Sequence, residues 1–341
     1  MNLSYLIIFI STFSFSVFFT WLTIKIALKF NIVDKPGLER KIHDKPMPLM
    51  GGLAIFLSYF IILFLVRDKL LIGQLDIHHF IGFFIGAVFL LIGGILDDKY
   101  NLKPAYQFVF PFLAIASVIM GGVQIEKITN PFGGFIYLGY LSAVLIGLWL
   151  LGMMYTTKLL DGMDGLVSGV VGIGGLIIFL FTMTTKYFQP DIGLAALILA
   201  SSCFGFLVFN WHPAKIFLGE GGSLLLGYIL GVLAIISGGK IAVALLIMGI
   251  PILDVAWTII RRLAAGKNPF KFADRKHLHF RIFDLGVSQR KTVLIFYLFS
   301  LIFGLSALFL QSKGKIYAFL VLFLLMLGII LTFNYADKKN S

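Results

Sequence analysis

The segment 80-FIGFFIGAVFLLIGGILDDKYNL-102 indicates the fold class of this chain. Residues 80–96 carry no charged side chain, and a helix of roughly 20 apolar residues crosses the hydrocarbon core of a bilayer. Two adjacent aspartates, Asp97 and Asp98, follow this run directly. Such a pair is either a solvated helix terminus or a functional site at membrane depth. Because the C-terminal end of a helix is already negative, carboxylates there indicate a cation nearby.

The composition extends this interpretation to the whole chain. Of the 341 residues, 59% are hydrophobic and 13% are charged, with a mean hydropathy of +0.99. Ordinary soluble domains carry about 25% charged residues, so a soluble fold is excluded. We predict an all-α polytopic integral membrane protein with about eleven spans, forming one transmembrane domain over residues 1–341. The expected spans are 4–24, 49–66, 80–96, 105–121, 135–156, 166–185, 192–209, 222–237, 240–260, 293–310 and 316–333.

The distribution of basic residues predicts the orientation. Of the 28 Lys and Arg residues, 21 lie in the loops from odd-numbered to even-numbered spans and in the C-terminal tail. Because cytoplasmic loops carry the excess of positive charge, we expect these segments in the cytoplasm and the N-terminus outside. The net charge of +12 then reflects topology and not nucleic-acid binding, and the single cysteine excludes an intramolecular disulfide. The expected catalytic cytoplasmic loops are 25–48, 97–104, 157–165, 210–222 and 261–292.

Two cytoplasmic motifs combine glycines with carboxylates. In KLLDGMDGL (158–166), Asp161 and Asp164 lie on a glycine-loosened turn that enters a span. They are suited to a cation, although Asp164 could also be a simple helix cap. In NWHPAKIFLGEGGSLLLG (210–227), glycines surround Glu220 at a helix start. Backbone N–H groups there can cradle phosphate, but a carboxylate beside phosphate requires a bridging divalent cation; a solvated glycine turn is the alternative.

Two cytoplasmic segments are basic. NPFKFADRKHLHFRIFDLGVSQRK (268–291) holds His277 and His279, and LERKIHDKPMPLMGG (38–52) holds Lys41 and His43. Cationic loops of this kind grip diphosphates, while the alternative for the flanking Lys and Arg is topological anchoring. Zinc binding by His-x-His is disfavoured because no Cys and no third His lies beside it. Carboxylates, glycine turns and basic loops on one face together form the inventory of a metal-assisted phosphoryl transfer, and the membrane location implies a lipid substrate.

Six motifs in order resemble one enzyme family. KIHDKPMPLMGG, GILDDKYNL, LLDGMDGL, FNWHPAKIFLGEGGS, PILD and ADRKHLHFRI, spread over about residues 34–292, are similar to those of the polyprenyl-phosphate N-acetylhexosamine-1-phosphate transferases of WecA, TagO and MraY type. The resemblance implies transfer of a sugar-1-phosphate from a UDP-N-acetylhexosamine to undecaprenyl phosphate, with release of UMP and a need for Mg²⁺ or Mn²⁺. It also implies a homodimer in the bacterial cytoplasmic membrane, with its active site on the cytoplasmic face.

The family resemblance and the chemistry of the loops together predict the residues of the active site. One residue of the Asp97–Asp98 pair would bind metal and the other would orient or deprotonate the lipid phosphate, although that phosphate is already ionised near pH 7. The expected catalytic residues are Asp97, Asp98, Asp161 and Asp164, and the expected metal ligands are Asp97, Asp98, Asp161 and Glu220. The expected substrate-binding residues are Lys41, His43, Asn210 (near the uracil), Gly221, Ser223, Arg275, His277, His279 and Arg281.

Three positions depart from the family pattern. Glu220 stands where the family usually has Asp, Lys158 replaces an Asn that often precedes DGxDGL, and His-Leu-His-Phe lacks a third histidine. Since Mg²⁺ demands near-ideal octahedral geometry, the longer Glu220 side chain implies a shifted loop, an altered metal preference or an intervening water.

The donor sugar and the function class have alternatives. The HLH motif, without a long insertion, is closer to the WecA/TagO branch, so we favour UDP-GlcNAc and the first membrane step of an O-antigen, teichoic acid or similar surface glycan. The alternative enzyme is the phospho-MurNAc-pentapeptide translocase. A non-enzymatic alternative is an ion-coupled transporter, which would place acids near mid-membrane on broken helices and not at helix ends on one side.

Overall fold

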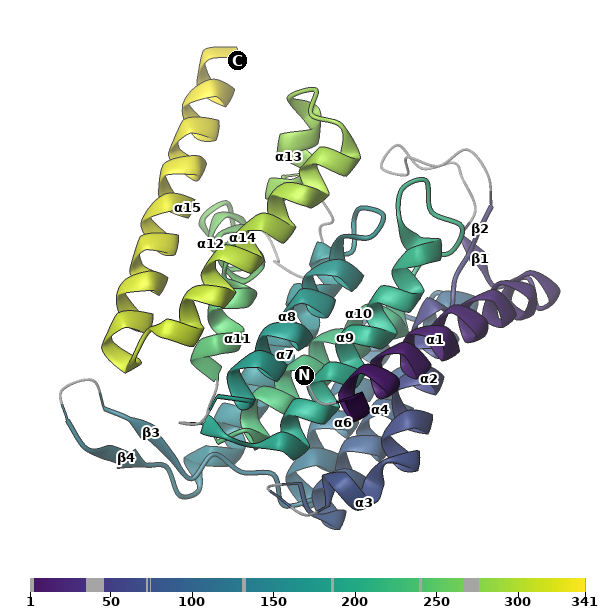
Figure 1. The fold of residues 1–341 in the computed structure, drawn as a ribbon. Helices are drawn as coiled ribbons and strands as arrows, with labels where there is room; N and C mark the ends of the chain where they lie inside the picture. Colours follow the sequence, from purple (N-terminus) through teal and green to yellow (C-terminus); the bar gives the residue numbers. More distant parts are fainter. Residues whose placement is uncertain are drawn as a thin grey trace.

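The computed structural model describes residues 3–34, 46–71, 73, 75–130, 133–184, 187–238, 241–266 and 276–340, which form mainly α-helices (Figure 1). The helices are α1 (Leu3–Lys29), α2 (Gly51–Leu65), α3 (Arg67–Leu70), α4 (Ile77–Tyr100), α5 (Pro104–Gln107), α6 (Val109–Met120), α7 (Leu141–Leu160), α8 (Leu166–Thr182), α9 (Pro190–Asn210), α10 (Gly219–Ile236), α11 (Ile241–Ile247), α12 (Gly249–Ala264), α13 (Leu278–Asp284), α14 (Gln289–Phe309) and α15 (Ser312–Asn340). Two short antiparallel hairpins pair β1 (Val33–Asp34) with β2 (Met47–Pro48) and β3 (Lys127–Thr129) with β4 (Phe135–Tyr137).

Seven helices of the described chain are long and apolar enough to cross a membrane. They are α1, α4, α7, α9, α10, α14 and the Ser312–Phe333 part of α15. The pair α11 and α12 passes the same test only when taken together, and Gly51–Leu65, Pro104–Met120 and Leu166–Thr182 are shorter apolar helices. The all-α polytopic class is therefore confirmed, while the number of about eleven spans stays a prediction.

The predicted span 240–260 is not one straight helix. It breaks at Met248 into α11 and α12, which are bent by 79°. Pro251 in the first turn of α12 lacks an N–H and would clash with the carbonyl four residues earlier, so the helix cannot run through. Gly249 allows close packing at the bend, since a Cβ there would lie 2.7 Å from Leu322. The break lets α12 take its own direction and bury Asp254 among the residues of the site.

The centre of the bundle is α10. In its spanning window 94% of the residues are buried, against 17% in α15. Glycines let its first turn touch two other helices backbone to backbone. A Cβ at Gly94 of α4 would lie 2.0 Å from the Cα of Gly221, and a Cβ at Gly52 of α2 would lie 2.3 Å from the Cα of Gly222. These contacts fix the start of α10 against the end of α4 and the start of α2.

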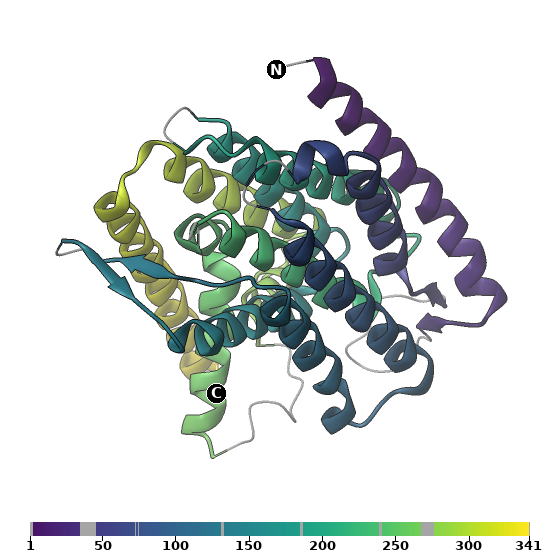
Figure 2. The same ribbon diagram turned by 90° about the horizontal axis from the view of Figure 1, so that it is seen from below.

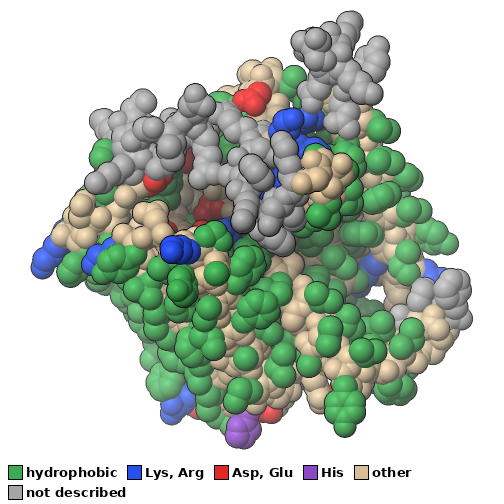
Figure 3. Space-filling model, turned by 180° about the vertical axis from the view of Figure 1, so that it is seen from behind, with side chains coloured by type: hydrophobic (Ala, Val, Ile, Leu, Met, Phe, Trp, Pro, Cys, Tyr) green, Lys and Arg blue, Asp and Glu red, His purple; other side chains and the backbone are tan. Residues whose placement is uncertain are grey.

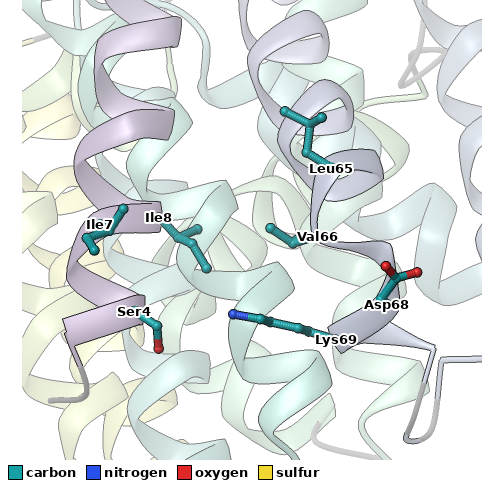
Figure 4. Close-up of a pocket in the computed structure, with 7 residues that line it drawn as sticks. All are labelled: Ser4, Ile7, Ile8, Leu65, Val66, Asp68 and Lys69. Atoms are coloured by element: carbon teal, nitrogen blue, oxygen red, sulfur yellow. The ribbon is translucent and has the colours of Figure 1, made fainter.

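The loops with the predicted chemistry lie at one end of the bundle. The turn 161–165, the loop 211–218, the β1–β2 hairpin and α13 are at the top of Figure 1, whereas α3 and the β3–β4 hairpin lie at the other end, where the hairpin projects from the bundle (Figures 1 and 2). A surface pocket of about 370 Å³ between α1 and the α2–α3 junction, lined by residues such as Ile8 and Lys69, belongs to that other end (Figure 4). The candidate site is thus confined to the loop end of the bundle.

Candidate active site

Asp97 closes the end of α4. Its Oδ1 accepts hydrogen bonds from the N–H of Leu102 (2.7 Å) and from Nε2 of Gln107 (3.1 Å). Asn101 ends the helix in the left-handed region, at φ 50°, a conformation that Asn tolerates better than most residues. The carboxylate is therefore held by the chain just beyond its own helix.

Asp98 joins α4 to α10. Its Oδ1 accepts the backbone N–H of Glu220 at 3.0 Å. Gly219, at φ +74°, permits this contact, because a Cβ there would lie 2.4 Å from Oδ2 of Asp98. A carboxylate is favoured at the positive N-terminal end of a helix. One of the N–H groups expected to cradle phosphate is therefore occupied by Asp98.

Glu220 and Lys158, the two acid-site departures from the family pattern, contact each other. The ammonium of Lys158, in the last turn of α7, forms an ion pair with Oε1 of Glu220. Lys158 also donates to Oε1 of Gln107 at 3.3 Å. Glu220 thus has a cationic partner from the chain itself.

Asp161 lies at the C-terminal end of α7. Protein atoms surround its carboxyl group on most sides, but part of the residue is exposed to solvent. Burial raises the pKa of Asp161 to about 8, and repulsion from Glu220, Asp98 and Asp164 adds to this shift. These three carboxylates therefore lie close enough to Asp161 to affect its pKa.

Asp164 and Asn210 join the DGMDGL turn to the loop that precedes α10. Oδ2 of Asp164 lies 2.7 Å from Nδ1 of His212 and accepts the N–H of Ala214 at 3.1 Å. Oδ1 of Asn210 accepts the N–H of Gly165 (3.1 Å) and the hydroxyl of Ser168 (2.9 Å), while its amide donates to the carbonyl of Ile216 (2.9 Å). Both side chains position the loops, and the expected uracil contact of Asn210 stays a prediction.

His277 is held by Asp254. Nδ1 of His277 lies 2.8 Å from Oδ2 of Asp254, whose Oδ1 accepts the N–H of Leu278 at 2.9 Å. Both side chains are buried. This carboxylate fixes the histidine and the first turn of α13 at once. A histidine oriented by a carboxylate presents its other ring nitrogen in a defined direction.

His279 is buried next to the DGMDGL turn. Its ring stacks on that of His277 with centroids 5.7 Å apart, and a Cβ at Gly162 would lie 2.6 Å from its Nε2. Neither ring nitrogen has a hydrogen-bond partner among the described residues. Burial lowers the pKa of His279 to about 3; the charge of His277 also lowers it, while Asp254 opposes the shift. The neutral ring has one donor and one acceptor that no described residue uses.

The other nominated residues have structural contacts or lie outside the described chain. Gly221 packs against α4, Ser223 donates to the carbonyl of Glu220 (3.1 Å), and the guanidinium of Arg281 lies over the ring of Phe333. Their expected substrate contacts stay predictions. Lys41, His43 and Arg275 lie outside the described residues.

Three residues of the candidate site were missed by the sequence-based assignment. Asp254 carried a signal, as the one acid embedded in an expected span, within PILD. His212 lies within a quoted motif but had no assigned partner. Gln107 offered no signal, because nothing in the sequence places it beside Asp97.

The carboxylates fit a hard cation, although no group of three His, Cys, Asp or Glu side chains in the described part of the chain is preassembled around one position. Oxygen ligands suit Mg²⁺, which often takes only one or two carboxylates and keeps several waters. Burial, and after it repulsion from Glu220, Asp98 and Asp164, raises the pKa of Asp161, and a bound cation would oppose this shift. In Figure 3, acidic side chains gather in the upper part of the face, with Lys and Arg beside them, above a broad apolar surface. The arrangement suits the binding of a cation together with a phosphorylated substrate at a membrane surface.

Comparisons with known proteins define the class as a membrane-bound glycosyl transferase. Residues 80–238 match glycosyl transferase family 4, and the chain belongs to this family. It is similar to a probable undecaprenyl-phosphate N-acetylglucosaminyl 1-phosphate transferase of Bacillus subtilis, with 34% identity over 89% of this chain and 84% of that protein.

Two other relatives widen the comparison. An undecaprenyl-phosphate alpha-N-acetylglucosaminyl 1-phosphate transferase of Thermotoga maritima is 31% identical over 96% of this chain and 97% of its own length. A phospho-N-acetylmuramoyl-pentapeptide-transferase of Halalkalibacterium halodurans is 32% identical over 80% of this chain and 86% of its own length.

Proposed function

We propose that this protein transfers N-acetylglucosamine-1-phosphate from UDP-GlcNAc to undecaprenyl phosphate and releases UMP, the first membrane step of a cell-surface glycan. The observation that carries the proposal is the meeting of Asp97, Asp98, Asp161 and Glu220, from three helix ends, at the loop end of a membrane bundle. The named activities of the relatives support the same reaction.

The reaction needs positioning more than covalent participation by the protein. An oxygen of the lipid phosphate attacks the phosphorus that carries the sugar, and the bond from this phosphorus to the oxygen bridging to UMP breaks. The attacking oxygen is ionised near pH 7, so the chain has mainly to align the two negative groups. Asp97, Asp98 and Asp161 would hold Mg²⁺ or Mn²⁺, and such an ion, when bound, neutralises charge on the diphosphate. His277, oriented by Asp254, and the neutral His279 supply hydrogen-bond donors for substrate phosphate or sugar.

The proposed setting is the bacterial cytoplasmic membrane. With about eleven spans, the N-terminus would lie outside, and the C-terminus and the active site would face the cytoplasm. The excess of basic residues in the loops at the site end supports this orientation. A homodimer is part of the proposal.

The test is UMP release by the purified protein in detergent, with undecaprenyl phosphate and Mg²⁺ or Mn²⁺. UDP-GlcNAc, UDP-GalNAc and UDP-MurNAc-pentapeptide are supplied in separate reactions. We expect lipid-dependent release from UDP-GlcNAc alone. Release from UDP-MurNAc-pentapeptide alone would replace the proposal by the translocase, the class of the third relative.

Replacing a site aspartate tests the residues. Asp98→Asn should lower UMP release at least about a hundredfold, since it removes a charge from the site while keeping its size. Asp68→Asn, at the other end of the bundle and with a side chain 95% exposed, is the matched control. Activity of Asp98→Asn equal to that of Asp68→Asn would exclude the acidic cluster as the active site.

A further inference from the structure

The ammonium of Lys158 lies within the acidic site and not on the protein surface. Its side chain is 22% exposed, and that of its ion-pair partner Glu220 is 20% exposed. Lys158 comes from the last turn of α7 and Glu220 from the first turn of α10. The pair therefore links two helix ends in a place largely shielded from solvent, where charges are screened less than in water.

The pair reaches both members of the Asp97–Asp98 doublet. On one side, Lys158 donates to Oε1 of Gln107 (3.3 Å), and Nε2 of Gln107 donates to Oδ1 of Asp97 (3.1 Å). On the other side, the backbone N–H of Glu220 donates to Oδ1 of Asp98 (3.0 Å). A connected set of contacts thus runs from Asp97 through Gln107, Lys158 and Glu220 to Asp98. Asp97, Gln107 and Glu220 also line one small cavity of about 10 Å³.

A divalent ion and the ammonium of Lys158 would compete for Glu220. If Glu220 ligated the ion, Lys158 would lose its ion-pair partner and lie next to a dication that repels it. The three aspartates suffice without Glu220, because Mg²⁺ is commonly held by one or two carboxylates and waters. The contacts therefore favour two different roles for the acids: the aspartates bind the ion, and Glu220 pairs with Lys158.

We propose that Lys158 is a built-in cation of this active site and a positioning residue for its aspartates. It keeps Glu220 out of the metal coordination sphere and orients Asp97 through Gln107 and Asp98 through the first turn of α10. Glu220 is therefore an ion-pair partner and not a metal ligand. This inference rests on the proposed function, because it assigns roles within that active site.

The first test is Mn²⁺ binding without substrate, followed through the electron paramagnetic resonance signal of free Mn²⁺. The double variant Lys158→Met/Glu220→Gln keeps the net charge and the three proposed ligands and loses only the alignment of Asp97 and Asp98. We therefore expect its Kd to rise by no more than about tenfold, the lower end of the effect of an outer-shell partner. Asp98→Asn, which removes a ligand itself, should weaken binding further, by at least about a hundredfold. A double variant that binds as weakly as Asp98→Asn would overturn the proposal, as would a wild-type protein that binds no Mn²⁺.

The second test separates positioning from bulk stability. We expect Lys158→Met to lower UMP release at least about tenfold, because Asp97 and Asp98 lose their alignment, and Lys158→Arg to retain most of the activity. Lys215→Met is the matched control, since Lys215 is an exposed lysine in the loop before α10 whose ammonium lies over the ring of Phe209, away from the acidic side chains. Activity of Lys158→Met equal to that of Lys215→Met would overturn the positioning role.

The two tests fail independently of the proposed function. Mn²⁺ binding needs neither lipid nor nucleotide, so the expected Kd pattern in a protein that releases no UMP would count against the transferase and support the assignment of Glu220. UMP release by wild type, combined with loss of Mn²⁺ binding in the double variant, would support the transferase and overturn the assignment of Glu220 as an ion-pair partner.

Discussion

Asp254 and His277 are separated by 23 positions in the sequence and lie 2.8 Å apart through their side chains. The carboxylate is buried in α12, where it also holds the backbone N–H of Leu278. A buried charge is retained only where such partners satisfy it. At the scale of single residues, the candidate site is therefore largely a set of paired groups, in which Asp97, Asp98, Asp164, Asp254 and Glu220 each have a donor from the chain.

The Asp254–His277 pair predicts a loss of activity without loss of fold. In Asp254→Asn the side chain still accepts the N–H of Leu278 but no longer provides a charge for the imidazole. Because small displacements of a positioning group are costly, we expect kcat for UMP release to fall roughly tenfold to a hundredfold. The measurement is kcat and KM together with the unfolding temperature in detergent. An unchanged kcat would show that the orientation of His277 is unimportant.

The pKa of Asp161 predicts a pH dependence of cation binding. Burial and neighbouring carboxylates raise this pKa to about 8, so below that pH the group carries a proton that a cation must displace. Mn²⁺ affinity should therefore weaken as the pH falls from about 9 to about 7, by at most about tenfold per pH unit. Mn²⁺ titrations across this range provide the measurement, and Asp161→Asn should flatten the profile. A flat wild-type profile would contradict the role of Asp161.

At the scale of elements, close helix crossings place the acids. The start of α10 touches α4 at Gly94–Gly221 and α2 at Gly52–Gly222. These approaches let the N–H of Glu220 reach Asp98. The bend between α11 and α12 has a comparable effect, because it directs Asp254 to α13. Helix packing in membranes relies on such small residues.

The contact between α4 and α10 predicts that a single added methyl group lowers the free energy of unfolding at this position. Gly94→Ala would place a Cβ 2.0 Å from the backbone of Gly221, and overpacking of this kind costs about 1–3 kcal/mol. Gly152→Ala in α7 is the control, since a Cβ there meets nothing within 4 Å, and removal of a helical glycine should stabilise by about 0.5–1 kcal/mol. Thermal unfolding in detergent should separate the two variants. Equal stability would mean that the crossing can relax.

At the scale of the whole molecule, the bundle has two chemically different ends. The end with the DGMDGL turn and α13 gathers the site residues, and the other end carries α3, the β3–β4 hairpin and the pocket beside Lys69 (Figures 1 and 4). The surface between them is apolar (Figure 3). This difference between the ends is the basis of the proposed orientation in a bilayer.

The orientation predicts one-sided labelling. Lys103 and Tyr140 are exposed at opposite ends of the bundle, and the natural Cys203 is buried. In intact cells, a membrane-impermeant maleimide should modify Tyr140→Cys but not Lys103→Cys, and permeabilisation should expose the latter. Wild type, with Cys203 alone, provides the background. Labelling of Lys103→Cys in intact cells would reverse the proposed topology.

The amino-acid sequence alone established the all-α membrane class of the molecule and predicted the members of its site. Apolar runs are local, so their positions can be predicted without tertiary contacts. The acids at the ends of those runs led to the prediction that Asp97, Asp98, Asp161 and Glu220 form one group. The predicted span 240–260 is an exception, because it breaks before Pro251. A hydropathy scale does not take into account that proline lacks an N–H for the helix.

The partner of each charged group became clear from the folded bundle alone. Nothing local links Lys158 to Glu220, Gln107 to Asp97, or Asp254 to His277; helix crossings bring these partners together. Each carboxylate pairs with the donors that the fold brings within hydrogen-bonding distance. Those distances depend on close helix packing such as that of Gly94 on Gly221. For this reason the sequence identified the chemical inventory, while the assignment of each carboxylate to a cation, an ion pair or a loop contact required the folded bundle.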